Sequence, residues 1–83
     1  MTGVFSIFDV KADAYRNLFT MNTKAQAIRS FSDLAHDEST DVGKHPEDYR
    51  LVKLGEFDES SGALVPTPME SLGFAIEWLS KKE

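Results

Sequence analysis

The segment NTKAQAIRSFSDLAHDEST, residues 22–40, constrains the fold more than any other part of the chain. Thr23 and Gln26 have the spacing of a capping box, in which the hydroxyl accepts a hydrogen bond from the third helical amide while the Gln26 side chain reaches back. A helix should therefore begin at Thr23. Its apolar residues recur at helical spacing and form one stripe, which consists of Ala27, Ile28, Phe31, Leu34 and Ala35. Such a stripe has to be buried against a second layer.

The residues before this helix predict a β-hairpin. Residues 4–10 and 15–21 are rich in β-branched and aromatic side chains, and KADA between them is short and polar enough for the connection. Alternation gives both faces of the first strand apolar side chains. We therefore expect one face to pack on the helix and the other to be covered by the C-terminal segment or by a second subunit.

A second hairpin is predicted after the helix. Residues 49–57 form a strand in which Gly55 indicates a bulge, DESSG supplies a turn with Gly62 at positive φ, and the short return strand ends at Pro66. In the segment before it, Pro46 limits the PED residues to a single turn. Strict alternation would place four side chains on one face of the third strand, namely Arg50, Val52, Leu54 and Glu56.

The C-terminal segment carries its own helix signals. Thr67, Pro68 and Glu70 match a cap, a proline at the first helical position and a capping-box glutamate, and Lys81 and Lys82 suit a helix C-terminus. Gly73 weakens such a helix by about 1 kcal/mol relative to alanine, so a shorter helix or an extended tail is the alternative. The expected fold is α+β with the order ββαββα: an antiparallel sheet of two hairpins packed on a central helix, followed by a short C-terminal helix.

Length and composition place limits on the kind of protein. A chain of 83 residues allows one domain, residues 1–83, with a thin core. The absence of cysteine excludes disulfides and thiolate metal sites. No stretch approaches the roughly 20 apolar residues that span a bilayer, and no basic leader with a long apolar run is present. We therefore expect a soluble, cytoplasmic protein without a membrane partner.

The charge is unevenly distributed along the chain. The formal net charge is −5. Residues 1–36 carry four basic and three acidic side chains, whereas residues 37–83 carry five basic and eleven acidic ones. Because phosphate neutralisation supplies most non-specific affinity for nucleic acid, this balance disfavours simple coating of DNA unless the basic groups gather on one surface.

Several residue types that often carry chemistry lack a matching pattern here. The histidines and carboxylates around Pro46 fit no metal or acid/base template, and we interpret them as solvated loop charges and turn caps. DESSG lacks the ligand spacing of an EF-hand, the glycines form no phosphate loop, and Ser60 and Ser61 have no histidine at a motif spacing. We therefore expect no enzyme, catalytic residue, metal site, cofactor or small-molecule substrate. The residues considered are His36, Asp37, Glu38, Asp41, His45, Glu47 and Asp48.

A basic and aromatic group is the remaining candidate site. On a sheet surface, tyrosines can stack on unpaired bases while cations meet phosphates. The alternative is that the tyrosines belong to the core and the cations only aid solubility. Phe74 and Trp78 are candidate anchors for a partner or a twin subunit, or else they complete the core. The candidate nucleic-acid-binding residues are Lys11, Tyr15, Arg16, Tyr49, Arg50 and Lys53.

Three segments carry a family resemblance: VFSIFDVKADAY (residues 4–15), TKAQAIRSFSDL (23–34) and KHPEDYRLVKLGEFDESSG (44–62). Together they resemble the small nonstructural protein of gokushovirus-type microviruses, which are tailless phages with small circular single-stranded DNA genomes. HPEDY followed by LGEFD is the specific combination, and residues 74–79 are less distinctive.

The resemblance implies a function that the residues by themselves do not. The family is described as DNA-binding or replication-associated and is likened to the protein that switches microviruses from double-strand amplification to single-strand synthesis and packaging. We accordingly expect a phage protein in the host cytoplasm that binds DNA, single-stranded in particular, or the replication or procapsid proteins. The alternative is a dimeric protein-interaction module without nucleic-acid contact. Salt-dependent binding of single-stranded DNA separates the two.

Overall fold

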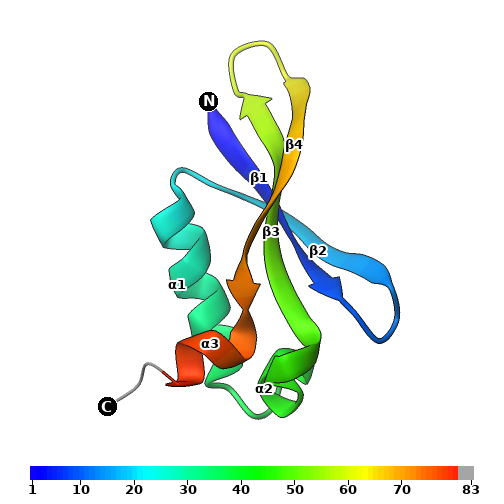
Figure 1. The fold of residues 1–83 in the computed structure, drawn as a ribbon. Coiled ribbons are helices and arrows are strands. Elements are labelled where there is room, and N and C mark those ends of the chain that lie inside the picture. Colours follow the sequence, from blue (N-terminus) through cyan, green and yellow to red (C-terminus); the bar gives the residue numbers. More distant parts are fainter. Residues whose placement is uncertain (81–83) are drawn as a thin grey trace.

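The computed structural model describes residues 1–80 and shows an α+β fold in which two β-hairpins share one sheet (Figure 1). The strand order is β2-β1-β3-β4, and every neighbouring pair is antiparallel. The predicted fold class and the order ββαββα are confirmed. The elements are β1 (Thr2–Asp9), β2 (Ala14–Met21), α1 (Lys24–Ala35), α2 (Asp41–Lys44), the 3-10 turn η1 (Pro46–Asp48), β3 (Tyr49–Asp58), β4 (Ala63–Phe74) and α3 (Ala75–Ser80).

Helix α1 begins where the capping signal predicts. The Thr23 hydroxyl accepts a hydrogen bond from the Gln26 amide at 3.1 Å. The apolar stripe of α1 packs on one face of the sheet, and α3 lies beside it on the same side (Figure 1). The buried residues of this face and of the helices form the core cluster. Its buried members include Phe5, Ile7, Ala27, Phe31, Ala35, Val42, Tyr49, Leu51 and Ala75.

The opposite face of the sheet, which we call the open face, is not covered by any helix of residues 1–80. Its centre is buried, because Val4, Ser6 and Val52 are 7%, 2% and 0% exposed, whereas on β2 Leu18 is 68% and Tyr15 51% exposed. The C-terminal helix does not cover this face, because α3 packs with α1 on the other side, and cover by a second subunit stays a prediction. None of the helices in this part of the chain is long and apolar enough to cross a membrane.

The C-terminal helix is shorter than the capping signal at Thr67 predicts, and the return strand does not end at Pro66. Strand β4 continues to Phe74 through both of its prolines. Proline has no N–H group to donate, and an edge strand such as β4 tolerates this because its outer side pairs with no other strand of residues 1–80. Gly73 adopts φ 124°, which glycine tolerates, and the Phe74 amide then donates to the Glu77 carboxylate at 3.0 Å. The shorter helix is thus the alternative that the structure shows. Lys81 and Lys82 lie outside the described residues.

Two short helical turns, α2 and η1, lie between α1 and β3. The single turn predicted at PED is confirmed as η1. Residues 41–44 form the helical turn α2, because the Thr40 hydroxyl caps it by accepting a hydrogen bond from the Gly43 amide at 3.0 Å.

One bulge in β3 and one in β2 shift the pairing with β1 by one residue. At the predicted bulge, Val4 pairs with Gly55 and Phe5 with Lys53, so Leu54 has no partner on β1. Glu56 therefore returns to the helix-covered face, where the Lys53 ammonium lies 2.8 Å from its carboxylate. The predicted placement of Glu56 beside Arg50 and Val52 is wrong, because strict alternation does not survive a bulge.

The second bulge lies in β2 and was not predicted. Ile7 pairs with Arg16 and Phe5 with Phe19, so two residues of β2 oppose Ser6 alone. Asn17 has φ 56°, a left-handed conformation that asparagine tolerates better than most residues. The bulge lets Phe19 face the core while Tyr15 lies on the open face.

Candidate nucleic-acid interface on the open sheet face

Four side chains form a continuous row across the open face, one from each strand. Phe8 pairs in register with Tyr15 on one side and with Arg50 on the other, and Arg50 pairs with Phe74. Because paired residues share a face, the four side chains are neighbours. The rings of Phe8 and Tyr15 have centroids 4.7 Å apart. We call Tyr15, Phe8, Arg50 and Phe74 the aromatic row.

Arg50 is the cation of this row. Its guanidinium carbon lies 5.1 Å from the centroid of Phe8 and 5.9 Å from that of Phe74, which is the geometry of a cation–π contact. Within residues 1–80 no carboxylate forms an ion pair with it, and its buried Nε has no hydrogen-bond partner. No carboxylate of residues 1–80 therefore neutralises the positive charge of Arg50, which can attract an anion.

Tyr15 provides the exposed aromatic surface. The side chain is half exposed, and its hydroxyl donates to the Met69 sulfur at 3.3 Å, across the width of the sheet. Met69 belongs to a part of β4 that departs from regular pairing between Pro66 and Glu70. A half-exposed ring that packs at a tilt against Phe8 can stack on an unpaired base.

The structure separates the six predicted nucleic-acid-binding residues. Tyr15 and Arg50 lie in the aromatic row, and Lys11 lies in the exposed turn that follows β1, without an ion pair in the described chain. Arg16 faces the other way and pairs with Asp9 at 3.3 Å, and Lys53 pairs with a glutamate on the helix-covered face.

Tyr49 is part of the core and not of the open face. It is 8% exposed, so its ring is not accessible for stacking. Burial raises the pKa of Tyr49 above its usual value of 10.0, and the carboxylates of Asp9 and Asp41 act in the same direction.

The two predicted partner anchors lie on different faces. Phe74 joins the aromatic row, whereas Trp78 packs against the core, where its buried indole nitrogen has no hydrogen-bond partner within residues 1–80. Sequence reasoning missed Phe8 as a site residue. Its alternation with Ile7 was the available signal, because Phe8 had to face away from the core if Ile7 faced it.

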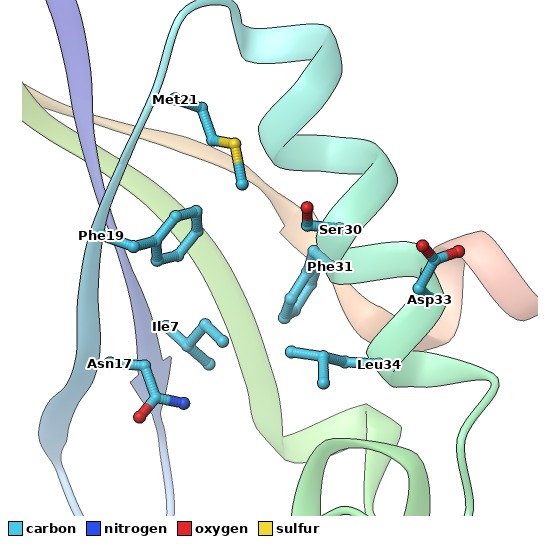
Figure 2. A pocket seen from close by; sticks show the side chains of 8 residues that line it. All are labelled: Ile7, Asn17, Phe19, Met21, Ser30, Phe31, Asp33 and Leu34. Atoms are coloured by element: carbon cyan, nitrogen blue, oxygen red, sulfur yellow. The ribbon is translucent and has the colours of Figure 1, made fainter.

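A crevice of about 360 Å³ opens where α1 and β2 diverge (Figure 2). Phe19 and Met21 of β2 face Phe31 and Leu34 of α1 across it, and Asp33 stands on its helix side. The lining is mainly apolar, with Asn17, Ser30 and Asp33 as its polar residues, so the crevice offers mostly contact area.

His45, Glu47 and Asp48 form the one group of three potential metal ligands in the described chain whose ligand atoms lie within 4.8 Å of one another. They belong to η1 and the residue before it, and His45 and Glu47 are exposed. Exposed carboxylates are strongly hydrated and often bind no ion. The expected absence of a metal site stays a prediction.

No curated protein and no solved structure matches the chain. A family model described as "Phage ORF5 protein" matches residues 2–78, which include all four strands and the aromatic row. Because this match covers nearly the whole chain, the protein belongs to the Phage ORF5 family and is a small accessory protein of a bacteriophage.

Proposed function

We propose that this protein binds single-stranded DNA across the aromatic row of its open face. The observation that carries the proposal is the alignment of Tyr15, Phe8, Arg50 and Phe74 across four paired strands on a face without a helix. Sheet surfaces with exposed aromatics and nearby cations are typical of proteins that bind single strands. The proposed role is non-catalytic.

The row favours single strands over duplexes for a physical reason. An unpaired base can leave its own stack and lie on Tyr15, whereas the bases of a duplex expose only their edges. Arg50 lies in the row and Lys11 follows β1 in an exposed turn, and neither forms an ion pair within residues 1–80. With about two phosphate contacts, the logarithm of the affinity should fall with the logarithm of salt concentration with a slope of about −1.4.

The biological setting is part of the same proposal. The resemblance to the nonstructural protein of gokushovirus-type microviruses supports a role in the host cytoplasm, in the switch toward single-strand synthesis and packaging. The net charge of −5 favours the second candidate, a protein-interaction module that contacts replication or procapsid proteins without touching DNA.

Fluorescence anisotropy with a labelled single-stranded oligonucleotide and the matching duplex, at low and moderate salt, tests the proposal. Tyr15→Ala should weaken single-strand binding about tenfold, since one base–aromatic stack contributes about 1–3 kcal/mol. Arg50→Gln should reduce the affinity and lower the magnitude of the salt slope by about 0.7. Arg29→Gln removes the same charge from an exposed site on α1 and should leave binding unchanged.

Two results would decide against DNA binding at this site. If the wild-type protein shows no salt-dependent binding of the single strand, the interaction-module candidate is preferred. If Tyr15→Ala and Arg50→Gln bind as tightly as Arg29→Gln, DNA contacts another surface.

A further inference from the structure

The open face carries a second feature, at the end of the sheet away from the aromatic row. A hollow of about 330 Å³ is lined there almost wholly by aliphatic groups around Gly55. Leu18 is 68% exposed and Leu64 67%. Soluble monomers seldom leave neighbouring aliphatic side chains this accessible. We call this group the aliphatic patch: Val4, Leu18, Leu54, Leu64 and Pro66.

Charge identifies the kind of partner that fits the aliphatic patch. None of its lining residues is charged, although the chain carries −5. A charged partner would find no group of opposite charge there, whereas an uncharged apolar surface would be complementary to the patch. Two copies of an acidic chain repel one another, so they associate best where neither presents a carboxylate. The aliphatic patch of a second copy is apolar and carries no carboxylate, so it meets both conditions.

The edges of the sheet restrict how two copies can meet. On β4, Pro66 and Pro68 lack N–H groups, and on β2 the left-handed Asn17 interrupts regular pairing. Both features prevent an edge strand from pairing with another chain. Two copies therefore cannot readily extend the sheet, and contact between faces is the arrangement that remains.

The accessible area limits the dimer to a weak one. From their exposed fractions, the side chains of the patch present on the order of 300–400 Å² per copy, so pairing would bury roughly 600–800 Å² in total, which is less than a stable interface buries. A dimer of this size should form only at high micromolar concentration and dissociate on dilution.

We propose that two copies of this protein pair face to face through their aliphatic patches, in a closed two-fold dimer. Val4 lies in the patch and Phe8 in the aromatic row, four residues and therefore about 13 Å apart along β1. The β3–β4 hairpin, which carries Leu64, projects beyond the end of α1, so α1 does not obstruct this end of the sheet (Figure 1). The proposal does not depend on DNA binding.

Sedimentation velocity and equilibrium of the full chain, from low to high micromolar concentration and without DNA, test the dimer. The weight-average mass should rise from that of one chain, 9.3 kDa, toward that of two. Leu18→Glu and Leu64→Glu should each raise the dissociation constant at least tenfold, because each buries a carboxylate in the apolar contact. Ile76→Glu makes the same change at another exposed aliphatic residue, on α3, and should dimerise like the wild type.

The outcomes separate clearly. A wild-type protein that stays at 9.3 kDa at the highest concentration overturns the proposal, as does growth beyond two copies. Dimerisation of both patch variants at wild-type strength would overturn it too, because another surface would then be the interface. Circular dichroism shows whether each variant is folded. Since Leu18 and Leu64 are largely exposed, we expect native spectra for both.

Discussion

Gly55→Ala tests the close approach of β3 and β4 that shapes the open face. A Cβ atom at this position would lie 2.5 Å from the Val65 carbonyl oxygen and 3.2 Å from the Pro66 Cα. Both are backbone atoms, so no side-chain rotation relieves the contact and the strands must separate. Overpacking of this kind costs about 1–3 kcal/mol, while the loss of glycine's freedom in the unfolded chain offsets about 0.4–1 kcal/mol. We expect a net loss of about 1–2 kcal/mol.

Urea denaturation followed by circular dichroism measures this loss. For a small domain with an m-value near 1 kcal/mol/M, the unfolding midpoint should fall by about 1–2 M. Asparagine at Gly55 should cost more than alanine. Asparagine at Gly62 should be nearly neutral, because that residue has φ 77° and no atom within 4 Å of its Cβ position. A Gly55→Ala protein as stable as the wild type would refute the close approach.

Two further predictions concern the first hairpin and the core. Asp9 is buried and accepts from the amides of Lys11 and Ala12 at 3.0 and 3.2 Å while pairing with Arg16. Asp9→Ala should therefore cost about 2–3 kcal/mol in urea unfolding, and Asp9→Asn, which keeps an acceptor for the turn, should cost less. For Tyr49, the raised pKa in the folded state means that its contribution to stability is complete below pH 10 and is lost as the pH rises through the folded pKa. Between pH 8 and 11 the urea midpoint of Tyr49→Phe should fall less steeply with pH than that of the wild type. Equal slopes for the two proteins would show that Tyr49 does not contribute to this pH dependence.

The elements that local signals specify were predictable. The Thr23 capping box and the stripe through Phe31 predict α1, because both act within a few residues of one another. The two hairpins follow from apolar runs separated by turn residues, including Gly62. These signals suffice for the fold class, since a helix with one apolar stripe and four such strands have few ways to bury their apolar surfaces.

The candidate site was predictable only in part. Tyr15 and Arg50 were named from residue type, and the structure brings them into one row with Phe8. Arg16 was grouped with them but lies on the other face, and Tyr49 is buried. Composition identifies residues that can bind nucleic acid, but the face on which each one lies depends on the register of its strand.

By itself, the sequence determines that this chain forms α1, two hairpins and an apolar surface larger than one helix can cover, because these properties arise from near neighbours along the chain. Tertiary structure alone decides which side chains share the open face. The bulge at Asn17 moves Tyr15 there, and the bulge at Leu54 and Gly55 moves Glu56 away. Likewise β4 runs through two prolines to Phe74 because it lies at the edge of the sheet. Each outcome depends on contacts between strands, which local propensity does not contain.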